Sequence, residues 1–309
     1  MRIYNGIDVF PGTHSACLTT GTFDGVHVGH KKILNILTST AAQKELESVL
    51  LTFYPHPRKV LFPEDHGLKL INTLNEKLEL LELEGIDHVI VQPFSAEFSR
   101  HDPVQYIRDI LVNKINAKHI VIGYDHRFGR NREGGIDDLK EMSSVYDFGI
   151  TEIGAEDINN VKVSSTKIRN ALLTNDFSTA ATYLGYDYFI SGVVVEGDKR
   201  GRELGFPTAN IEIDDDTKLI PNQGVFAVRV QLGTNQLNGM MNIGTNPTFS
   251  NSGKRTIEVH IFNFENDIYN NEIKVSIYQR LRDEQKFKTA EELVEQMNRD
   301  KIDAINLLQ

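Results

Sequence analysis

The sequence predicts two domains of different fold class: an α/β domain with a parallel sheet covered by helices on both faces, then an antiparallel β-barrel with a terminal helix. The chain has 309 residues, which is enough for roughly two domains. From Cys17 to about Leu184, short apolar runs alternate with helical patterns. After Tyr186 the long helical patterns stop, and short β-rich runs separated by polar turns follow. We therefore expect the domains to span residues 1–184 and 185–309.

Four apolar runs in the first half are expected to form buried strands, with helices between them. Continuous apolar strands that alternate with helices are typical of a parallel sheet with both faces covered. Asp102 followed by Pro103 predicts a helix start, because a capping residue precedes a proline at a first helical position. The expected strands are 16–20, 49–53, 88–91 and 119–122, and the expected helices are about 33–44, 72–84 and 103–111.

The second half contains six short β-rich runs at regular spacing, which predicts a closed antiparallel barrel. A final amphipathic helix from about Ala290 to Leu307 is expected to pack against it. The expected strands are 188–195, 208–213, 225–231, 237–243, 256–262 and 273–278.

The segment Gly21–His30 connects the first expected strand to the first helix and predicts a phosphate site. Glycines let the backbone turn tightly and let a ligand approach it closely. The start of a helix offers unpaired N–H groups and the positive end of its dipole to a phosphate. His27 and His30 add hydrogen-bond donors, or positive charge if they are protonated. The alternatives are a purely structural turn, surface histidines, or half of a zinc site that would need further ligands.

Further polar and basic residues are expected at the same edge of the sheet, because ligands bind beyond the carboxyl ends of parallel strands. They lie in Tyr54–Arg58 and in Gly123–Gly135. Ser164–Arg169 opens another helix, and its serines could be plain N-caps. Lys167 and Arg169, however, are cations in the first turn, where the helix dipole disfavours them, so an anion is expected there.

Two common nucleotide-binding motifs are absent. No two glycines have the spacing G-x-G, so the dinucleotide fingerprint is missing. Gly192–Gly197 has the glycine spacing of a Walker A loop, but Asp198 stands in the lysine position.

In the second half, the loop Gly197–Asn210 combines glycines with basic side chains that could bind phosphates. Thr208 and Asn210 offer two neutral oxygen atoms, and Mg²⁺ prefers such ligands together with water and phosphate. Glu258 lies in an expected strand and could accept a proton from a hydroxyl group. An exposed charged hairpin and a solvated glutamate are the alternatives.

These motifs resemble those of prokaryotic bifunctional riboflavin kinase/FMN adenylyltransferases, also called FAD synthetases. The resemblance covers nearly the whole chain. It implies a Rossmann-like nucleotidyltransferase domain of the H-x-G-H type, with S-S-T-x-I-R as its second signature, followed by a riboflavin kinase barrel. The segments that carry it are Gly21–His30, Thr52–Pro57, Gly123–Gly134, Ser164–Arg169, Gly197–Asn210, Asn242–Thr248 and Arg280–Glu284.

The resemblance implies two reactions: ATP phosphorylates riboflavin to FMN in the C-terminal domain, and a second ATP then adenylylates FMN to FAD and pyrophosphate in the N-terminal domain. In the N-terminal domain it implies catalytic roles for His27, His30 and Arg169. Many family members have Phe where this chain has His126, so flavin contacts there transfer less directly. The implied ATP-binding residues are Gly21, Phe23, Asp24, Gly29, Asp125, Ser164, Ser165 and Thr166, and the implied flavin-binding residues are Pro55, His56, Arg127 and Phe128.

In the barrel the resemblance implies that Glu258 is the catalytic base and that Thr208 and Asn210 hold ATP with Mg²⁺. The implied flavin-binding residues are Arg282 and Glu284. The implied ATP and phosphate ligands are Gly197, Lys199, Gly201, Arg202, Pro207, Thr208 and Asn210.

Composition limits the partners. The net charge of −10 argues against a protein that wraps nucleic acid. The single Cys17, the absence of an apolar stretch of roughly 18 residues and the lack of a signal peptide predict a cytoplasmic protein. The expected partners are riboflavin, FMN, FAD, ATP, ADP and pyrophosphate, with weak self-association left open.

Three other functions stay open at this point. The chain could be an FMN adenylyltransferase whose barrel only binds flavin. It could transfer nucleotides to another acceptor, such as a phosphopantetheine or cytidylyl substrate, which would leave the barrel unexplained. It could also be a flavin-binding protein without enzymatic activity.

Overall fold

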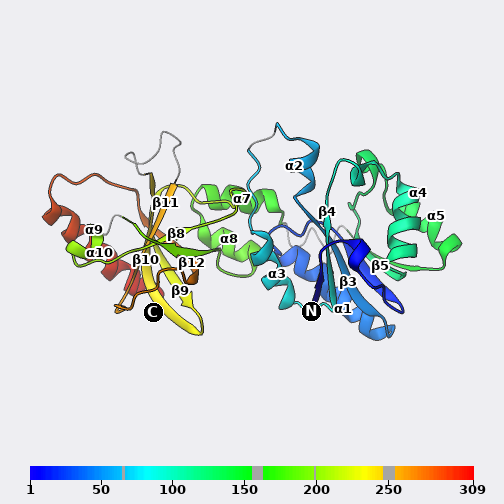
Figure 1. Ribbon diagram of the computed structural model, residues 1–309, viewed down its shortest axis with the longest axis horizontal. Coiled ribbons are helices and arrows are strands. Elements are labelled where there is room, and N and C mark those ends of the chain that lie inside the picture. The colour runs from blue at the N-terminus through cyan, green and yellow to red at the C-terminus, as the bar shows by residue number, and fades with distance from the viewer. Residues whose placement is uncertain (65–66, 155–162, 198–199, 246–254) are drawn as a thin grey trace. The chain divides into compact units, whose positions relative to one another are not determined.

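The computed structural model describes residues 1–64, 67–154, 163–197, 200–245 and 255–309 (Figure 1). The chain divides into two compact units, Met1–Ser165 and Thr166–Gln309. This division falls earlier in the sequence than residue 185, so helices α7 (Ser165–Leu173) and α8 (Phe177–Leu184) belong mostly to the second unit. The functional boundary near residue 185 stays a prediction.

The first unit contains a six-stranded sheet in which all neighbouring strands are parallel, as predicted. The order in which strands are added reverses between β2 and β5, since β3 and β4 lie on one side of β2 and β5 and β6 lie on the other. Ligands bind at such a switch point in open α/β sheets. The edge strands β1 and β6 were not predicted. The strands in spatial order are β1 (Arg2–Tyr4), β4 (His88–Pro93), β3 (Glu47–Tyr54), β2 (Ala16–Thr20), β5 (Ala117–Gly123) and β6 (Gly149–Ile153).

The helices of this unit begin where the sequence provides caps. Thr73 and Glu76 form a capping box at α3, and Asp102 and Gln105 form another one at the helix that begins at Pro103, as expected for these residue types. The chain after α4 continues as a π-helical segment, Tyr106–Lys114. The helices are α1 (Val28–Gln43), α2 (Pro57–Leu61), α3 (Leu74–Glu82), α4 (Pro103–Gln105) and α5 (Ile136–Tyr146), with short 3-10 turns at Ile7–Val9, Phe98–Arg100 and Arg130–Arg132.

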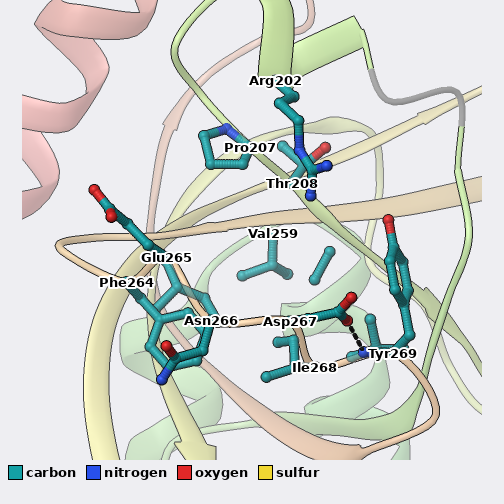
Figure 2. Close-up of a pocket in the computed structure, with 13 residues that line it drawn as sticks. Arg202, Pro207, Thr208, Val259, Phe264, Glu265, Asn266, Asp267, Ile268 and Tyr269 are labelled. Atoms are coloured by element: carbon teal, nitrogen blue, oxygen red, sulfur yellow. Dashed lines mark hydrogen bonds between the residues drawn. The ribbon is translucent and has the colours of Figure 1, made fainter.

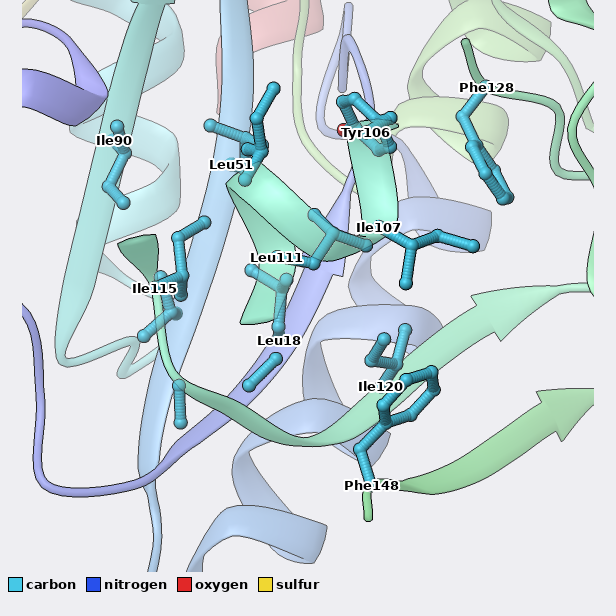
Figure 3. Close-up of a cluster of buried hydrophobic side chains, with 14 of the residues drawn as sticks. Leu18, Leu51, Ile90, Tyr106, Ile107, Leu111, Ile115, Ile120, Phe128 and Phe148 are labelled. Atoms are coloured by element: carbon cyan, nitrogen blue, oxygen red, sulfur yellow. The ribbon is translucent and has the colours of Figure 1, made fainter. Parts of the chain in front are cut away.

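The main core of the first unit lies on one face of the sheet. Figure 3 shows Ile107 and Leu111 of the π-helical segment packed against alternate strand residues such as Leu18. The intervening strand residues are also buried but do not belong to this cluster, and neither do the buried residues of α1. Both faces of the sheet are therefore covered, which confirms the predicted layering.

The second unit contains a closed barrel with antiparallel pairing between all neighbouring strands. Each of the six predicted runs forms one strand. The barrel strands are β7 (Phe189–Val195), β8 (Ala209–Glu212), β9 (Gly224–Leu232), β10 (Asn235–Thr245), β11 (Arg255–Ile261) and β12 (Glu272–Arg282), and the short helix α9 spans Arg200–Glu203.

The terminal helix α10 (Ala290–Leu308) covers one side of the barrel, as predicted. Its Ala304 and Leu308 pack against Phe206, Met240 and Phe262. Across the described ranges of the chain, the helices are all too short or too polar to cross a membrane.

Candidate active sites

The glycine-rich segment after β2 forms a tight loop that ends at the start of α1. The backbone of Phe23 and Val26 has positive φ angles of 49° and 34°, a conformation that is rare for side chains of this size. Gly29 lies so close to the His27 ring that a Cβ atom would be 3.2 Å from it. Strained backbone of this kind is found mostly where function requires a fixed loop.

His27 and His30 form one stacked pair at the start of α1. Their ring centroids are 3.6 Å apart, and the ring planes differ by 11°. The His27 Nδ1 accepts a hydrogen bond from the His30 backbone N–H at 3.2 Å, so His27 is the N-cap of the helix. The Phe23 ring lies against His30 with centroids 4.9 Å apart. The structure therefore brings together four predicted site residues, Phe23, His27, Gly29 and His30.

The environment of His30 favours the neutral imidazole. Its pKa lies well below the ordinary value, first because burial disfavours the charged ring, and then because of the nearby charges of His27 and Lys77. Its Nδ1 atom is buried and has no hydrogen-bond partner. Of the two options that the sequence left open, the structure favours a hydrogen-bonding His30 over a cationic one.

Lys77 lies beside this loop and was not among the predicted site residues. It lies on α3 with only 7% of its surface exposed, and its Nζ donates to the Thr52 Oγ1 at 3.0 Å and to the Thr22 carbonyl at 3.3 Å. A lysine three residues after Leu74, on the apolar stripe of a helix, was the signal that could have revealed it.

Asp24 fastens the same loop to the segment before α3. Its Oδ1 accepts hydrogen bonds from the backbone N–H groups of Ile71 at 2.9 Å and Asn72 at 3.4 Å. Its carbonyl accepts a hydrogen bond from the Ser165 Oγ at 3.0 Å. Gly21 lies next to Phe23, whose ring would be 2.9 Å from a Cβ atom at that glycine.

The predicted flavin residues of the first unit fall into an exposed group and a buried one. Pro55 and Arg127 are exposed, as is the predicted ATP ligand Asp125, and the His56 Nδ1 caps α2 by accepting the Arg58 N–H at 3.2 Å. Phe128 is only 7% exposed and belongs to the core cluster.

Phe128 is the middle ring of an aromatic stack. Its ring lies 5.4 Å from Tyr106 and 6.0 Å from His126, with nearly parallel planes in both pairs. The Tyr106 hydroxyl is 3.1 Å from the Thr20 Oγ1 at the end of β2. Burial lowers the pKa of His126 to about 4, so this ring is neutral at physiological pH.

The second signature lies at the start of α7. Ser164 and Thr166 are exposed, and Arg169 is half-buried one turn into the helix. Thr166 and Arg169 belong to the second compact unit.

In the barrel, three predicted residues lie together on two neighbouring strands. Glu258 on β11 pairs directly with Asn210 on β8, so the two side chains share one face of the sheet. The Thr208 hydroxyl, just before β8, lies 3.5 Å from the Glu258 Oε2. The Asn210 amide lies over Gly197, where a Cβ atom would be 2.0 Å from its nitrogen. The predicted ligand Lys199 and the end of the Asn242–Thr248 segment lie outside the described residues.

A small cavity of about 80 Å³ opens beside these residues (Figure 2). Arg202, Pro207 and Thr208 form one side of it, and the loop Phe264–Tyr269 between β11 and β12 forms the other. The sequence analysis missed this loop, because only the barrel closure brings it next to Thr208. In the Gly197–Asn210 loop, a Cβ atom at Gly201 would lie 2.3 Å from the Phe206 carbonyl oxygen.

The predicted flavin segment at the end of β12 is held by α10. The Arg282 Nε and Nη2 donate to the Asp300 carboxylate at 2.9 and 2.7 Å, and Asp300 is only 2% exposed. Glu284 is exposed, and its Oε1 lies where a side chain at Gly244 would begin.

Within the described residues, no three His, Cys, Asp or Glu side chains are grouped so that they could hold a metal ion. The zinc alternative for His27 and His30 therefore has no support in this part of the chain. The oxygen atoms of Thr208 and Asn210 instead suit Mg²⁺, which usually takes few protein ligands and keeps water and phosphate oxygens.

The chain matches two family models. Residues 11–167 match the FAD synthetase family, and residues 184–308 match the riboflavin kinase family. The second match favours two activities over an adenylyltransferase whose barrel only binds flavin.

Relatives that cover almost the whole chain are each named bifunctional riboflavin kinase/FMN adenylyltransferase. The Buchnera aphidicola (Schizaphis graminum) protein is 37% identical over 97% of this chain and 96% of its own. The Escherichia coli K12 protein is 36% identical over 98% and 97%, and the Bacillus subtilis protein is 36% identical over 93% and 91%.

A solved structure from Streptococcus pneumoniae, described as a macrolide-efflux protein, is 31% identical with a TM-score of 0.86. It covers 99% of this chain and 98% of its own, so the fold is shared over the full length. From the two family matches and the near-complete coverage of the relatives, the chain belongs to the family of bifunctional riboflavin kinase/FMN adenylyltransferases.

Proposed function

We propose that the two activities of the family act in sequence and that each uses the residues described above. The barrel phosphorylates riboflavin with ATP, and the first domain then transfers the adenylyl group of a second ATP to the FMN formed. The adenylyltransferase domain comprises residues 1–184 and the kinase domain residues 185–309. The stacked histidines at the phosphate loop and the Thr208–Asn210–Glu258 cluster are the observations that support this division of labour.

In the adenylyl transfer, a phosphate oxygen of FMN attacks the α-phosphorus of ATP. A new P–O bond forms, the bond to the β-phosphate oxygen breaks, and pyrophosphate leaves. The protein needs no nucleophile of its own, so catalysis consists of positioning and stabilisation of the developing charge. His27, Gly29 and His30 lie where a helix N-terminus can hold the phosphates of ATP.

In this proposal the neutral His30 donates a hydrogen bond to the α-phosphate in the transition state. The leaving pyrophosphate is held by the second signature, with Arg169 as the cation. The further ATP ligands of this site are Gly21, Phe23, Asp24, Asp125, Ser164, Ser165 and Thr166.

For the flavin of the first domain we propose the exposed loop residues Pro55, His56 and Arg127. Phe128 supports them from the core through its stack with His126.

In the kinase reaction, the 5′-hydroxyl oxygen of riboflavin attacks the γ-phosphorus of ATP. The bond from the γ-phosphorus to ADP breaks, and the hydroxyl proton moves to the Glu258 carboxylate. Mg²⁺ bound with ATP supplies charge neutralisation at the phosphates, and Thr208 and Asn210 are the residues that would hold it. The side chains of Arg202 and Lys199 and the backbone of Gly197 and Gly201 bind the phosphates.

We place the base of ATP against the cavity beside Thr208. Pro207, Val259 and Phe264 give it apolar walls, while the phosphates would extend toward Thr208. Arg282 and Glu284 contact the flavin at the other substrate position of the barrel.

The cellular setting is part of the same proposal. The net charge of −10 and the single, buried Cys17 support a cytoplasmic enzyme that binds neither nucleic acid nor membranes. We also propose weak self-association, which sedimentation at several protein concentrations tests.

Labelled ATP tests the proposed chemistry. With riboflavin, Mg²⁺ and ATP labelled in the γ-phosphate, the label should appear in FMN and remain in FAD. With ATP labelled in the α-phosphate, the label should appear in FAD and never in FMN. FMN without γ-label, or FAD without α-label, would contradict the assignment of the two reactions.

A further inference from the structure

The starting observation is a lysine buried beside the adenylyl-transfer loop. Lys77 is 7% exposed, and moving an ammonium group out of water costs several kcal/mol unless it gains strong interactions. Its two hydrogen bonds go to the Thr22 carbonyl and the Thr52 hydroxyl. An apolar side chain at such a position would pack between the helix and the sheet without this desolvation cost. Packing alone therefore does not explain why a lysine occupies this position.

The two acceptors of Lys77 belong to two different segments, a loop and the neighbouring strand. Thr22 lies in the phosphate loop after β2, and Thr52 lies near the end of β3, which leads into the Tyr54–Arg58 loop. The Thr52 Oγ1 also donates to the Thr22 carbonyl at 3.3 Å, so the three groups form a closed triangle. Lys77 thus fixes the ends of two neighbouring strands at the edge where substrates are expected.

The phosphate loop is tied to the α3 region at two points. Asp24 accepts the N–H groups of Ile71 and Asn72 just before α3, and Lys77 on α3 donates to Thr22. Phe23 lies between these two ties, has a positive φ angle and packs against His30. Loss of one tie should let Phe23 and the His30 ring shift together.

Lys77 also acts on His30 through its charge. The charges of His27 and Lys77 lower the pKa of His30, and the charge of Asp24 raises the pKa of Lys77. The pKa of Lys77 falls to about 8 because of burial, opposed by Asp24, so a large share of the lysines carries a charge near neutral pH. That charge adds to burial and to the charge of His27 in lowering the pKa of His30.

We propose that Lys77 is a positioning residue of the adenylyl-transfer site, which fixes the Thr22–Phe23 backbone beside His30. Lys77 acts through its neighbours and does not touch the substrate. The proposal rests on the adenylyl-transfer function proposed above for the first domain.

The test compares Lys77→Met with Lys118→Met, a matched change at an exposed lysine on β5. Both full-length variants are assayed for FMN adenylylation and, on the same chain, for riboflavin phosphorylation. We expect Lys77→Met to lower kcat for adenylylation by about 10–100-fold, since a misplacement of about 1 Å can cost about 10²-fold. KM for ATP should change less than about threefold, because ground-state binding of ATP does not depend on the His30 geometry. Lys118→Met should match the wild type.

The pH profile separates positioning from a purely structural role. Without the Lys77 charge, the pKa of His30 rises, although burial and His27 still hold it below its ordinary value. The low-pH loss of adenylylation should then begin at a higher pH in Lys77→Met than in the wild type, while Lys77→Arg, which keeps the charge, should retain the wild-type profile. Wild-type kcat in Lys77→Met, an effect confined to KM for ATP, or an unchanged pH profile would each overturn the proposal.

A second variant keeps the test decisive if Lys77→Met impairs folding, which loss of the first domain's urea-unfolding transition would reveal. Thr52→Val keeps the shape of this fully buried residue and removes only the hydroxyl, which accepts from Lys77 and donates to the Thr22 carbonyl. It should lower adenylylation by about tenfold and leave kinase activity unchanged, and wild-type adenylylation in this variant overturns the proposal. If the wild-type enzyme itself forms no FAD from FMN and ATP, the function proposed for the domain fails instead.

Discussion

The Arg282 guanidinium and the Asp300 carboxylate form two parallel hydrogen bonds, from Nε to Oδ1 at 2.9 Å and from Nη2 to Oδ2 at 2.7 Å. The Gln296 amide donates to the same carboxylate at 2.9 Å. The pair connects the end of β12 to α10 and is mostly shielded from solvent. Because the guanidinium is planar and both of its partners are fixed, this contact holds Arg282 in one orientation beside the flavin segment.

Asp300→Asn should destabilise the barrel by about 3 kcal/mol, because removal of one charge from a largely buried pair leaves the other without compensation. Urea unfolding followed by circular dichroism measures this, fitted with separate transitions for the two domains. Asp303→Asn, an exposed change on the same helix, is the control. If the two variants unfold at the same urea concentration, the pair does not stabilise the barrel.

His30→Asn should lower FMN adenylylation by about 10²–10³-fold, because the shorter amide cannot reach the position from which the imidazole donates to the developing charge. Riboflavin phosphorylation by the same chain should not change. Chromatographic measurement of FAD formed from FMN and ATP gives the rate, with the exposed His14→Asn as the control. A His30→Asn enzyme within threefold of the wild type would show that the imidazole has no role in the reaction.

Glu258→Gln should lower riboflavin phosphorylation by about 10²–10⁴-fold, the usual contribution of a general base. The amide keeps the size of the side chain and cannot accept the proton. Adenylylation of supplied FMN should stay at the wild-type rate. Glu272→Gln, at the exposed start of β12, should leave both reactions unchanged. Equal phosphorylation rates in Glu258→Gln and the wild type would exclude this carboxylate as the base.

The stability of the first domain should fall as the pH drops from about 6.5 to 4, partly because of His126. Its folded pKa of about 4 lies below the unfolded value of 6.5, so unfolding takes up a proton in this range. The stabilisation is complete above about pH 6.5 and is lost progressively below it. His126→Phe should remove about 2–3 kcal/mol of this dependence. Urea unfolding at pH 5 and 7 measures it, and identical pH slopes in variant and wild type would contradict the prediction.

The sequence predicted the strands and helices best where the apolar pattern is local. The barrel strands and α10 match the predicted runs closely, because the alternation of apolar and polar residues and the turn signals each extend over only about ten residues. The edge strand Arg2–Tyr4 was missed because it is short and half exposed, and its pairing with β4 comes from a distant part of the chain.

The site was predictable to the extent that its residues lie in contiguous motifs. His27 and His30 are three residues apart, and the helix brings them together. Lys77 and the loop Phe264–Tyr269 could not be predicted in the same way, because only the tertiary fold brings them next to Thr22 and Thr208. The protonation preference of His30 also depends on burial and on a charge from another helix, which no local pattern contains.

The measurement that tests the central claim most directly is product analysis over time, with riboflavin, ATP and Mg²⁺, for the wild type and for the His30→Asn and Glu258→Gln variants. Two separate sites predict FMN and then FAD in the wild type, FMN alone in His30→Asn, and no product in Glu258→Gln unless FMN is supplied. If one variant lost both reactions, or if FAD formed from riboflavin in either variant at the wild-type rate, the two reactions would not be divided between the domains as proposed.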